Sequence, residues 1–328
     1  MSSRGPLIAT RPLLQVNDLC VDYLTEQGPV RAVDRVTLEV ARGEFLGIVG
    51  ESGCGKSTLL FAIARLLSAP AEISSGEIWF DGKDMVSMDE DELRHLRWSD
   101  YSVVMQSAMN ALNPVMTIAE QLGDAIQAHV RMRDRQLRSR SQELLKVVGI
   151  DPVHLQSYPH QLSGGMRQRA MIAMALALTP DLVIMDEPTS ALDVVAQRSL
   201  LLKIKQLQRE FGFATIFVTH DMSLVSHFSD RLAVMYAGQV VEVGQTRQVF
   251  AGPKHPYTVG LMRSFPSISG PLQPLAGIPG SPPDLAHPPS GCRFHPRCPK
   301  RFDRCPGEEP ALYVSDEALV RCFLFDDR

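Results

Sequence analysis

The chain has 328 residues, of which 45% are hydrophobic, and this is enough for one large domain with an appendage. Thirty-three Lys and Arg against 37 Asp and Glu give a formal charge of -4, which disfavours a dedicated nucleic-acid binder. The longest apolar run, 170–178, is shorter than the roughly 18 residues of a membrane span, and Arg11 and Pro12 interrupt the apolar start, so we expect a cytoplasmic protein that meets membranes only through partners.

The first part of the chain predicts strands. Residues 13–24 and 30–40 are rich in Val and Leu with partial alternation, which indicates an antiparallel sheet. Residues 44–50 form a short apolar run ending in Gly, as in a buried central strand. A helix is expected over 56–67, where Leu and Ile recur at helical spacing, and a hairpin over 76–85.

The next segments predict helices and then a parallel sheet. Residues 107–165 have helical patterns, and 181–188 and 214–221 are apolar strands separated by a helical stretch at 196–212. After a hairpin at 231–244 the composition changes near Gly252, and prolines between 266 and 310 predict an irregular tail. We therefore divide the chain into an α/β core at 1–250, with a helical subdomain at about 107–165, and an extension at 251–328.

The segment "GESGCGKS", residues 50–57, matches G-x-x-x-x-G-K-[ST] between a predicted strand and a predicted helix. Its glycines let successive amides turn inward around phosphate oxygens, and the helix amino terminus adds positive potential. Lys56 supplies a charge to the outer phosphates and Ser57 a hydroxyl for Mg²⁺. The nucleotide-binding residues predicted in this segment are Gly50, Ser52, Gly53, Gly55, Lys56, Ser57 and Thr58.

A phosphate loop of this kind also needs acidic residues. The apolar run "LVIM" delivers Asp186, suited to hold Mg²⁺, and Glu187, suited to orient or deprotonate the attacking water. The alternative is a solvated strand terminus. Adjacent carboxylates beside a polyphosphate repel one another without a cation, which favours the magnesium interpretation.

Four further segments identify a family. Together with the phosphate loop, "LSGGMRQR" at 162–169, "VVMQ" ending at Gln106, "VIMDEPTSALD" and "FVTHD" resemble, in order, the motifs of the ATP-binding subunit of ABC transporters. The resemblance spans most of residues 13–245. It implies a P-loop ATPase core with an antiparallel β-subdomain and a helical subdomain.

The resemblance also implies roles for individual residues. Ser163, Gly164 and Gly165 match the signature motif, which caps the nucleotide held by the opposite subunit, so two such subunits must meet face to face.

Gln106 matches the residue that reaches Mg²⁺ and the attacking water, and His220 the histidine that contacts the terminal phosphate. Residues 190–193 match a loop that crosses the dimer interface. Tyr23 matches an aromatic that stacks on adenine, although a strand tyrosine on a sheet surface is an alternative.

The carboxyl-terminal part narrows the resemblance. "HPYTVGLMRSFP", "GIPGSPPDL" and "GCRFHPRCP" resemble the extension of ATPases that serve dipeptide, oligopeptide and nickel importers. The implied assembly is a heterodimer with a paralogous ATP-binding subunit, bound to two membrane permeases at the cytoplasmic face of the cell membrane and supplied by an extracytoplasmic substrate-binding protein. Peptide is the favoured substrate, and nickel and oligosaccharide are the alternatives.

Non-transport ABC ATPases of DNA repair, chromosome structure and translation form a competing class. Those proteins usually carry two ATPase halves, long coiled-coil insertions or basic DNA-binding modules, and the sequence contains no sign of them.

Four of the six cysteines lie in the tail, at positions 292, 298, 305 and 322. A cytoplasmic location argues against disulfides, and the close C-x-x-C pairs typical of zinc sites are missing. Four thiolates on a proline-stiffened loop could hold a [4Fe-4S] cluster, with nearby arginines offsetting its charge, and the family resemblance points the same way. Zinc and unligated thiols remain as alternatives. The predicted ligands are Cys292, Cys298, Cys305 and Cys322, and the arginines are Arg293, Arg297, Arg301 and Arg304.

Overall fold

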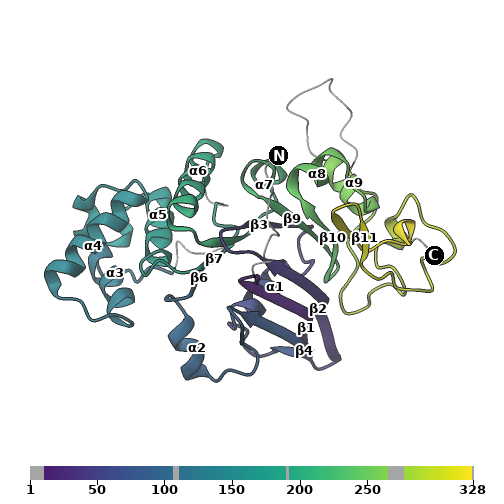
Figure 1. Ribbon diagram of the computed structural model, residues 1–328, viewed down its shortest axis with the longest axis horizontal. Helices are drawn as coiled ribbons and strands as arrows, with labels where there is room; N and C mark the ends of the chain where they lie inside the picture. Colours follow the sequence, from purple (N-terminus) through teal and green to yellow (C-terminus); the bar gives the residue numbers. More distant parts are fainter. Residues whose placement is uncertain (1–10, 106–110, 190–191, 265–276, 327–328) are drawn as a thin grey trace, which may run out of the picture.

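The computed structural model describes residues 11–105, 111–189, 192–264 and 277–326. Figure 1 shows the elements spread along one long axis. Helices α3 (Ile118–Gln127) and α4 (Asp134–Val147) lie at one end, and the chain after residue 277 lies at the other. The strands occupy the space between them, so the helical region and the extension do not meet.

The central sheet contains eight strands within the described residues. Its parallel part, in the order β9-β3-β8-β7-β6, confirms the predicted α/β class, and β10, β12 and β11 continue it antiparallel. In sheet order, the strands are β11 (Tyr313–Ser315), β12 (Ala318–Val320), β10 (Gln239–Gln245), β9 (Arg231–Tyr236), β3 (Phe45–Val49), β8 (Ala214–Val218), β7 (Leu182–Asp186) and β6 (Tyr101–Val104).

Strand β3 shows why the sheet is covered on both faces. Its residues are all buried, and alternate side chains enter different cores: Phe45 and Val49 one, Leu46 and Ile48 the other. The first core includes the helical region, and the second includes α1 (Lys56–Ile63) and an antiparallel sheet. A continuous apolar run is therefore required at this position.

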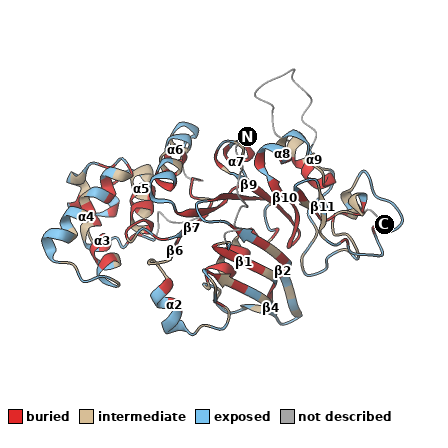
Figure 2. Ribbon diagram, in the orientation of Figure 1, coloured by how far each residue is buried: buried red, intermediate tan, exposed pale blue. Residues whose placement is uncertain are grey.

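The antiparallel sheet has the order β2-β1-β4-β5. Its strands are β1 (Leu14–Thr25), β2 (Gly28–Val40), β4 (Ala71–Phe80) and β5 (Lys83–Asp84). Figure 2 shows buried residues along β1 and exposed ones toward the ends of β2 and β4. This sheet confirms the predicted antiparallel β-subdomain.

The helical region begins with a well-capped helix. The Thr117 hydroxyl accepts from the backbone N–H of Glu120, whose carboxylate accepts from the backbone N–H of Thr117, and so α3 starts at Ile118. After α4, the chain forms η2 (Pro152–Gln156), η3 (Pro159–Gln161) and α5 (Gly164–Ala175). None of the helices in the described ranges is both long and apolar enough to cross a membrane.

Several elements differ from the sequence-based prediction, which also contained no strand for β6, β11 or β12 and no helix for α8 (Thr246–Ala251) or α9 (Pro256–Arg263). Helix α1 ends at Ile63 rather than near residue 67, because Arg65 adopts the left-handed region with φ of 53°. Strand β4 begins at Ala71 rather than 76. Helix α2 (Glu90–Leu96) was not predicted, although Asp89 and Glu92 form a capping box that signals its start.

The remaining helices pack on the sheet and lead into the extension. They are α6 (Val194–Phe211), α7 (Met222–Phe228), α8 (Thr246–Ala251) and α9 (Pro256–Arg263). In residues 277–310 the regular structure is η4 (His295–Arg297), as the prolines predict, and η5 (Phe323–Phe325) follows β12. The extension returns to the core because β12 pairs with β10 through Val320 opposite Glu242.

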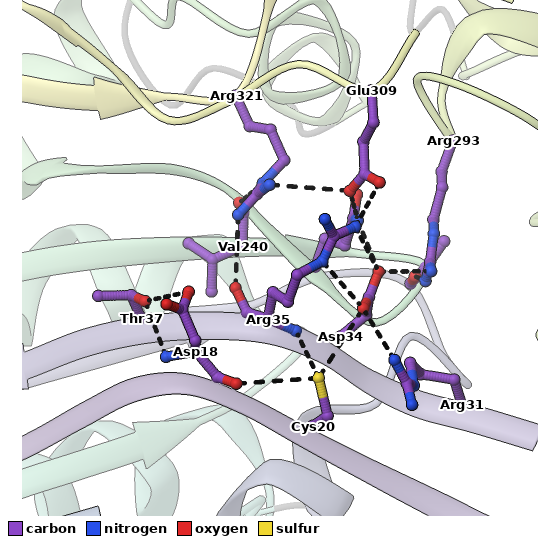
Figure 3. A network of polar contacts seen from close by, with 12 residues as sticks. Asp18, Cys20, Arg31, Asp34, Arg35, Thr37, Val240, Arg293, Glu309 and Arg321 are labelled. Carbon is purple, nitrogen blue, oxygen red and sulfur yellow. Dashed lines mark hydrogen bonds and ion pairs between the residues drawn. The ribbon is translucent and has the colours of Figure 1, made fainter. Parts of the chain in front are cut away.

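Polar contacts also join the extension to β2 (Figure 3). Asp34 is buried and accepts hydrogen bonds from Arg293 at 2.6 Å and Gln239 at 2.9 Å, while Glu309 pairs with Arg35 and Gln239. Burial raises the pKa of Asp34, but the hydrogen bond from Arg35 and the charge of Arg293 outweigh it and hold this pKa below its ordinary value. Asp34 is therefore ionised, and its charge is balanced by arginines from both sides of the junction.

Arg293→Gln should weaken this junction. The variant removes a charged donor from a buried carboxylate, which we expect to cost about 2 kcal/mol because Arg35 and Gln239 still contact Asp34. Thermal unfolding and the rate of tryptic cleavage after residue 277 measure the effect. Arg304→Gln, at an exposed arginine whose partners are Glu308 and Asp326, is the matched control. Equal cleavage rates in the wild type and Arg293→Gln would contradict the assigned role of the ion pair.

Candidate functional site

The predicted phosphate loop connects β3 to α1. Gly53 and Gly55 have φ of 76° and 98°, in the region that favours glycine, and this curls the loop. A Cβ atom at Gly55 would lie 2.2 Å from the backbone oxygen of Ala32, so the loop also presses against β2. Lys56 Nζ donates to the backbone oxygens of Gly50 at 2.8 Å and Glu51 at 2.9 Å. The lysine is thereby held over the loop.

Acidic residues lie at the carboxyl ends of the neighbouring parallel strands. Asp186 ends β7, and Glu187 follows with φ of 45°, an uncommon backbone conformation that is frequent at functional sites. His220 follows β8, and its Nδ1 lies 3.2 Å from Oε1 of Glu187. Because parallel strands end at the same edge, residues distant in sequence meet beside the phosphate loop.

Asp186 has the environment of a cation ligand. It is buried, and its Oδ1 has no hydrogen-bond partner among the described residues. Burial, and then the charge of Glu187, raise the pKa of Asp186, while the nearby Ser57 hydroxyl and Lys56 charge oppose the rise. A carboxylate oxygen without a partner next to a hydroxyl is a donor set that suits Mg²⁺, so these residues fit the predicted ion.

One cavity of about 530 Å³ brings most of the predicted site residues together. Gly50 and Asp186 do not line this cavity. Each contacts a residue that does: Gly50 contacts Lys56, and Asp186 contacts Ser57. Gln106 lies outside the described residues. Val30, Ala32 and Leu285 were missed, since ordinary apolar residues carry no sequence signal for ligand contact. The lining residues are Tyr23, Val30, Ala32, Ser52, Gly53, Gly55, Lys56, Ser57, Thr58, Glu187, His220 and Leu285.

Tyr23 forms part of the cavity wall. It is half-buried, and its hydroxyl lies 3.2 Å from Oγ1 of Thr58 in α1. This contact fixes the ring beside the phosphate loop. Stacking on adenine stays a prediction.

The predicted signature residues lie away from this cavity. Ser163 caps α5, and its hydroxyl accepts from the backbone N–H of Met166 at 3.2 Å. Gly165 instead faces a second cavity of about 620 Å³ beside Leu192 and Asp193. Ser190 lies outside the described residues. The positive end of α5 is thus available to a ligand other than the one in the chain's own phosphate loop.

The four tail cysteines line one small cavity with Phe294, Phe302 and Phe323. All four are free thiols. Burial raises the pKa of Cys292 and of Cys322 to about 11, so both are protonated at neutral pH. Within the described ranges, no three His, Cys, Asp or Glu side chains form a group able to hold a metal ion. The cavity that the four thiols share with these aromatic residues is small, at about 10 Å³.

The expectation that four arginines offset a cluster charge was wrong for three of them. Arg293 pairs with Asp34, Arg297 with Glu51, and Arg304 with Glu308 and Asp326, so carboxylates already balance these charges. Sequence could not reveal this because two of the carboxylates lie more than 240 residues away.

Burial raises the pKa of Cys298, and the charges of the nearby Lys300 and Arg301 oppose this rise only in part. These two residues therefore provide the cationic surroundings of the thiols.

Comparison with known proteins agrees with these features. The family model described as ABC transporter matches residues 33–190, and the model described as oligopeptide/dipeptide transporter, C-terminal region, matches 241–305. The chain is similar to the dipeptide transport ATP-binding protein DppD of Caldanaerobacter subterraneus subsp. tengcongensis, with 41% identity over 96% of this chain and 98% of the relative. It is 44% identical to DppD of Escherichia coli K12, over 94% and 96% of the two chains.

A solved structure is also similar. The dimeric ATP-binding cassette MJ0796, in a post-hydrolysis state bound to ADP and phosphate, aligns with a TM-score of 0.65 and 31% identity. The alignment covers 71% of this chain and 99% of that one.

Gly55→Ala should destroy the phosphate loop. The added methyl group meets a backbone oxygen at a left-handed φ, and we expect a loss of about 3 kcal/mol of stability or a rearranged loop that no longer binds nucleotide. Gly252→Ala is the matched control, because its Cβ atom would meet nothing within 4 Å. Thermal unfolding and binding of a fluorescent ATP analogue report the two effects, and normal binding by Gly55→Ala would refute this account of the loop.

Proposed function

Because the chain belongs to the ATP-binding proteins of dipeptide and oligopeptide ABC transporters, we propose that it hydrolyses ATP to drive the uptake of small peptides. The observation that carries the proposal is the single cavity in which the phosphate loop, Glu187 and His220 converge. Such a cavity suits a nucleoside triphosphate, and the two family models connect it to transport.

In this proposal the phosphate loop and Lys56 bind the phosphates of ATP, and Tyr23 stacks on the adenine. Ser57 and Asp186 hold Mg²⁺, together with Gln106. When bound, the ion neutralises charge on the outer phosphates. The orphaned Oδ1 of Asp186 supports this assignment.

Glu187 accepts a proton from the attacking water, and His220 contacts the terminal phosphate. The 3.2 Å contact between His220 Nδ1 and Glu187 Oε1 supports a shared role at the same phosphate.

The working unit is a dimer with a paralogous ATP-binding subunit. Ser163, Gly164 and Gly165 cap the nucleotide in the partner's phosphate loop, and this is supported by their distance from the chain's own cavity and by the dimeric state of MJ0796. Binding of two ATP molecules closes the dimer, and hydrolysis removes the phosphate that holds it closed.

The dimer acts on two membrane permeases from the cytoplasmic face of the cell membrane, and an extracytoplasmic binding protein delivers the substrate. The names of the relatives favour dipeptides or oligopeptides. Nickel or oligosaccharide is the alternative cargo, because the choice of substrate belongs to the permeases and the binding protein.

We also propose that Cys292, Cys298, Cys305 and Cys322 hold a [4Fe-4S] cluster. Their convergence on one cavity screened by three phenylalanines supports a buried all-thiolate site. Zinc is the alternative occupant of this site. Each of the four cysteine sulfurs would then lie about 2.3 Å from the metal, and the sulfurs would lie within about 4 Å of one another. The cluster would cross-link an extension that has little regular structure.

Glu187→Gln tests the enzymatic proposal. In a complex reconstituted with the partner ATPase, permeases and binding protein, we expect the variant to retain ATP while hydrolysis falls by about 100-fold or more, because the general base is lost.

The same complex tests the substrate. Peptide should stimulate ATP hydrolysis by the wild-type complex, whereas nickel or oligosaccharide should not. Glu210→Gln, an exposed glutamate in α6, is the control. Normal hydrolysis by Glu187→Gln would remove Glu187 from its role, and stimulation by nickel alone would change the substrate.

Cys298→Ser tests the cluster. Anaerobically purified wild-type protein should contain about four irons and four sulfides per chain with visible absorbance, and the variant should lose them. Cys20→Ser, in the distant strand β1, should keep them. One zinc per chain, or no metal in active protein, would eliminate the cluster.

A further inference from the structure

A buried arginine of the extension holds the phosphate loop. Arg297 Nη1 and Nη2 donate to the carboxylate of Glu51 at 2.7 and 3.0 Å, and the arginine side chain is only 6% exposed. This geometry is a bidentate, charge-assisted pair, which is among the stronger polar contacts in proteins. Glu51 is the second residue of the "GESGCGKS" loop, so the pair joins η4 to the phosphate loop.

Arg297 itself is rigidly placed. Its Nε donates to the backbone oxygen of Pro279 at 2.8 Å, and its guanidinium lies 5.7 Å from the ring centroid of Tyr236. Tyr236 packs against Tyr257 and Phe294, with ring centroids 4.6 and 5.2 Å apart. This aromatic cluster therefore fixes the position from which Arg297 contacts Glu51.

Glu51 connects Arg297 and its aromatic cluster to Lys56, the lysine of the phosphate loop. Its backbone N–H donates to the Tyr257 hydroxyl at 2.9 Å, and its backbone oxygen accepts from Lys56 Nζ at 2.9 Å. The carboxylate, the N–H and the carbonyl of one residue are thus all engaged. A shift of Glu51 would move an acceptor of Lys56.

The extension also reaches the nucleotide cavity itself. Leu285 lines the cavity wall, and residues 282–285 lie along residues 51–54 of the phosphate loop. Arg293 also binds Asp34 of β2, but neither of these two residues lines the cavity. The contact through residues 282–285 therefore places the extension directly beside the phosphate loop.

We propose that Arg297 is a positioning residue of the ATP site, which holds Glu51 and with it the phosphate loop in its nucleotide-binding shape. The cysteine-containing extension is thereby a part of the nucleotide site and not only an appendage. This inference rests on the proposed ATP-binding function, and it adds a contact that lies outside the phosphate loop in the sequence.

The test measures affinity for a fluorescent ATP analogue in the full-length chain, so it does not depend on hydrolysis or transport. Arg297→Gln and Glu51→Gln should each weaken binding by about tenfold, the loss expected when a charge-assisted hydrogen bond is removed. The affinity of Arg297→Lys for the analogue should lie between the affinities of these variants and the wild type, because lysine keeps the positive charge but cannot form two parallel hydrogen bonds to the carboxylate. The double variant should bind no more weakly than about the weaker single variant, since both changes break one interaction.

Two controls separate positioning from general loosening. Arg304→Gln leaves the loop untouched, and Arg293→Gln loosens the extension without breaking the Arg297–Glu51 pair, so both should bind the analogue within about twofold of the wild type.

In the assembled complex, Arg297→Gln should raise the KM for ATP while kcat changes by less than about threefold, because Arg297 touches no reacting atom. The proposal would be overturned if Arg297→Gln and Glu51→Gln bound the analogue with wild-type affinity. It would also be overturned if Arg293→Gln lost as much affinity for the analogue as Arg297→Gln does. A wild-type complex that binds the analogue but does not hydrolyse ATP would count against the proposed function alone.

Discussion

The phosphate loop has a backbone shape that contacts from neighbouring elements help to hold. Gly53 and Gly55 adopt left-handed conformations, and the loop amides must face a ligand rather than one another. Neighbouring elements supply the missing constraint. Strand β2 presses on Gly55, the Tyr257 hydroxyl binds the backbone of Glu51, and Arg297 binds its carboxylate. The site therefore depends on contacts from three distant parts of the sequence.

The predicted catalytic residues at the ends of the parallel strands also depend on contacts between distant parts of the sequence. Parallel pairing of β7 and β8 places Asp186 and Glu187 beside His220, and β3 delivers the phosphate loop to the same edge. The signature helix α5 begins elsewhere, with its capped amino terminus away from this edge. In the proposed mechanism, a chain arranged in this way holds one half of each of two composite sites, and this is the physical reason for dimerisation.

Two of the polar junctions between the extension and the core differ in consequence. Arg293 and Asp34 join it to the outer sheet within a network of several arginines and carboxylates. Arg297 and Glu51 join it to the phosphate loop through a single bidentate pair. Cys292 directly precedes Arg293 and Cys298 directly follows Arg297, so two of the four thiols are next to these junctions along the chain.

The sequence alone determined the fold class and most of the cavity, because apolar strand runs alternating with helical stretches, the glycine loop and the strand-end carboxylates are local patterns. The resemblance to the family also indicated Tyr23 and His220. The tertiary structure decided what local patterns cannot encode. Arg297 and Glu51 are 246 residues apart, so only the path of the folded chain brings them together beside the phosphate loop. Leu285 is an ordinary apolar residue in an irregular segment, and only the fold places it in the wall of the nucleotide cavity. The helix α1 boundary likewise followed from one left-handed residue, Arg65, that helical periodicity does not reveal.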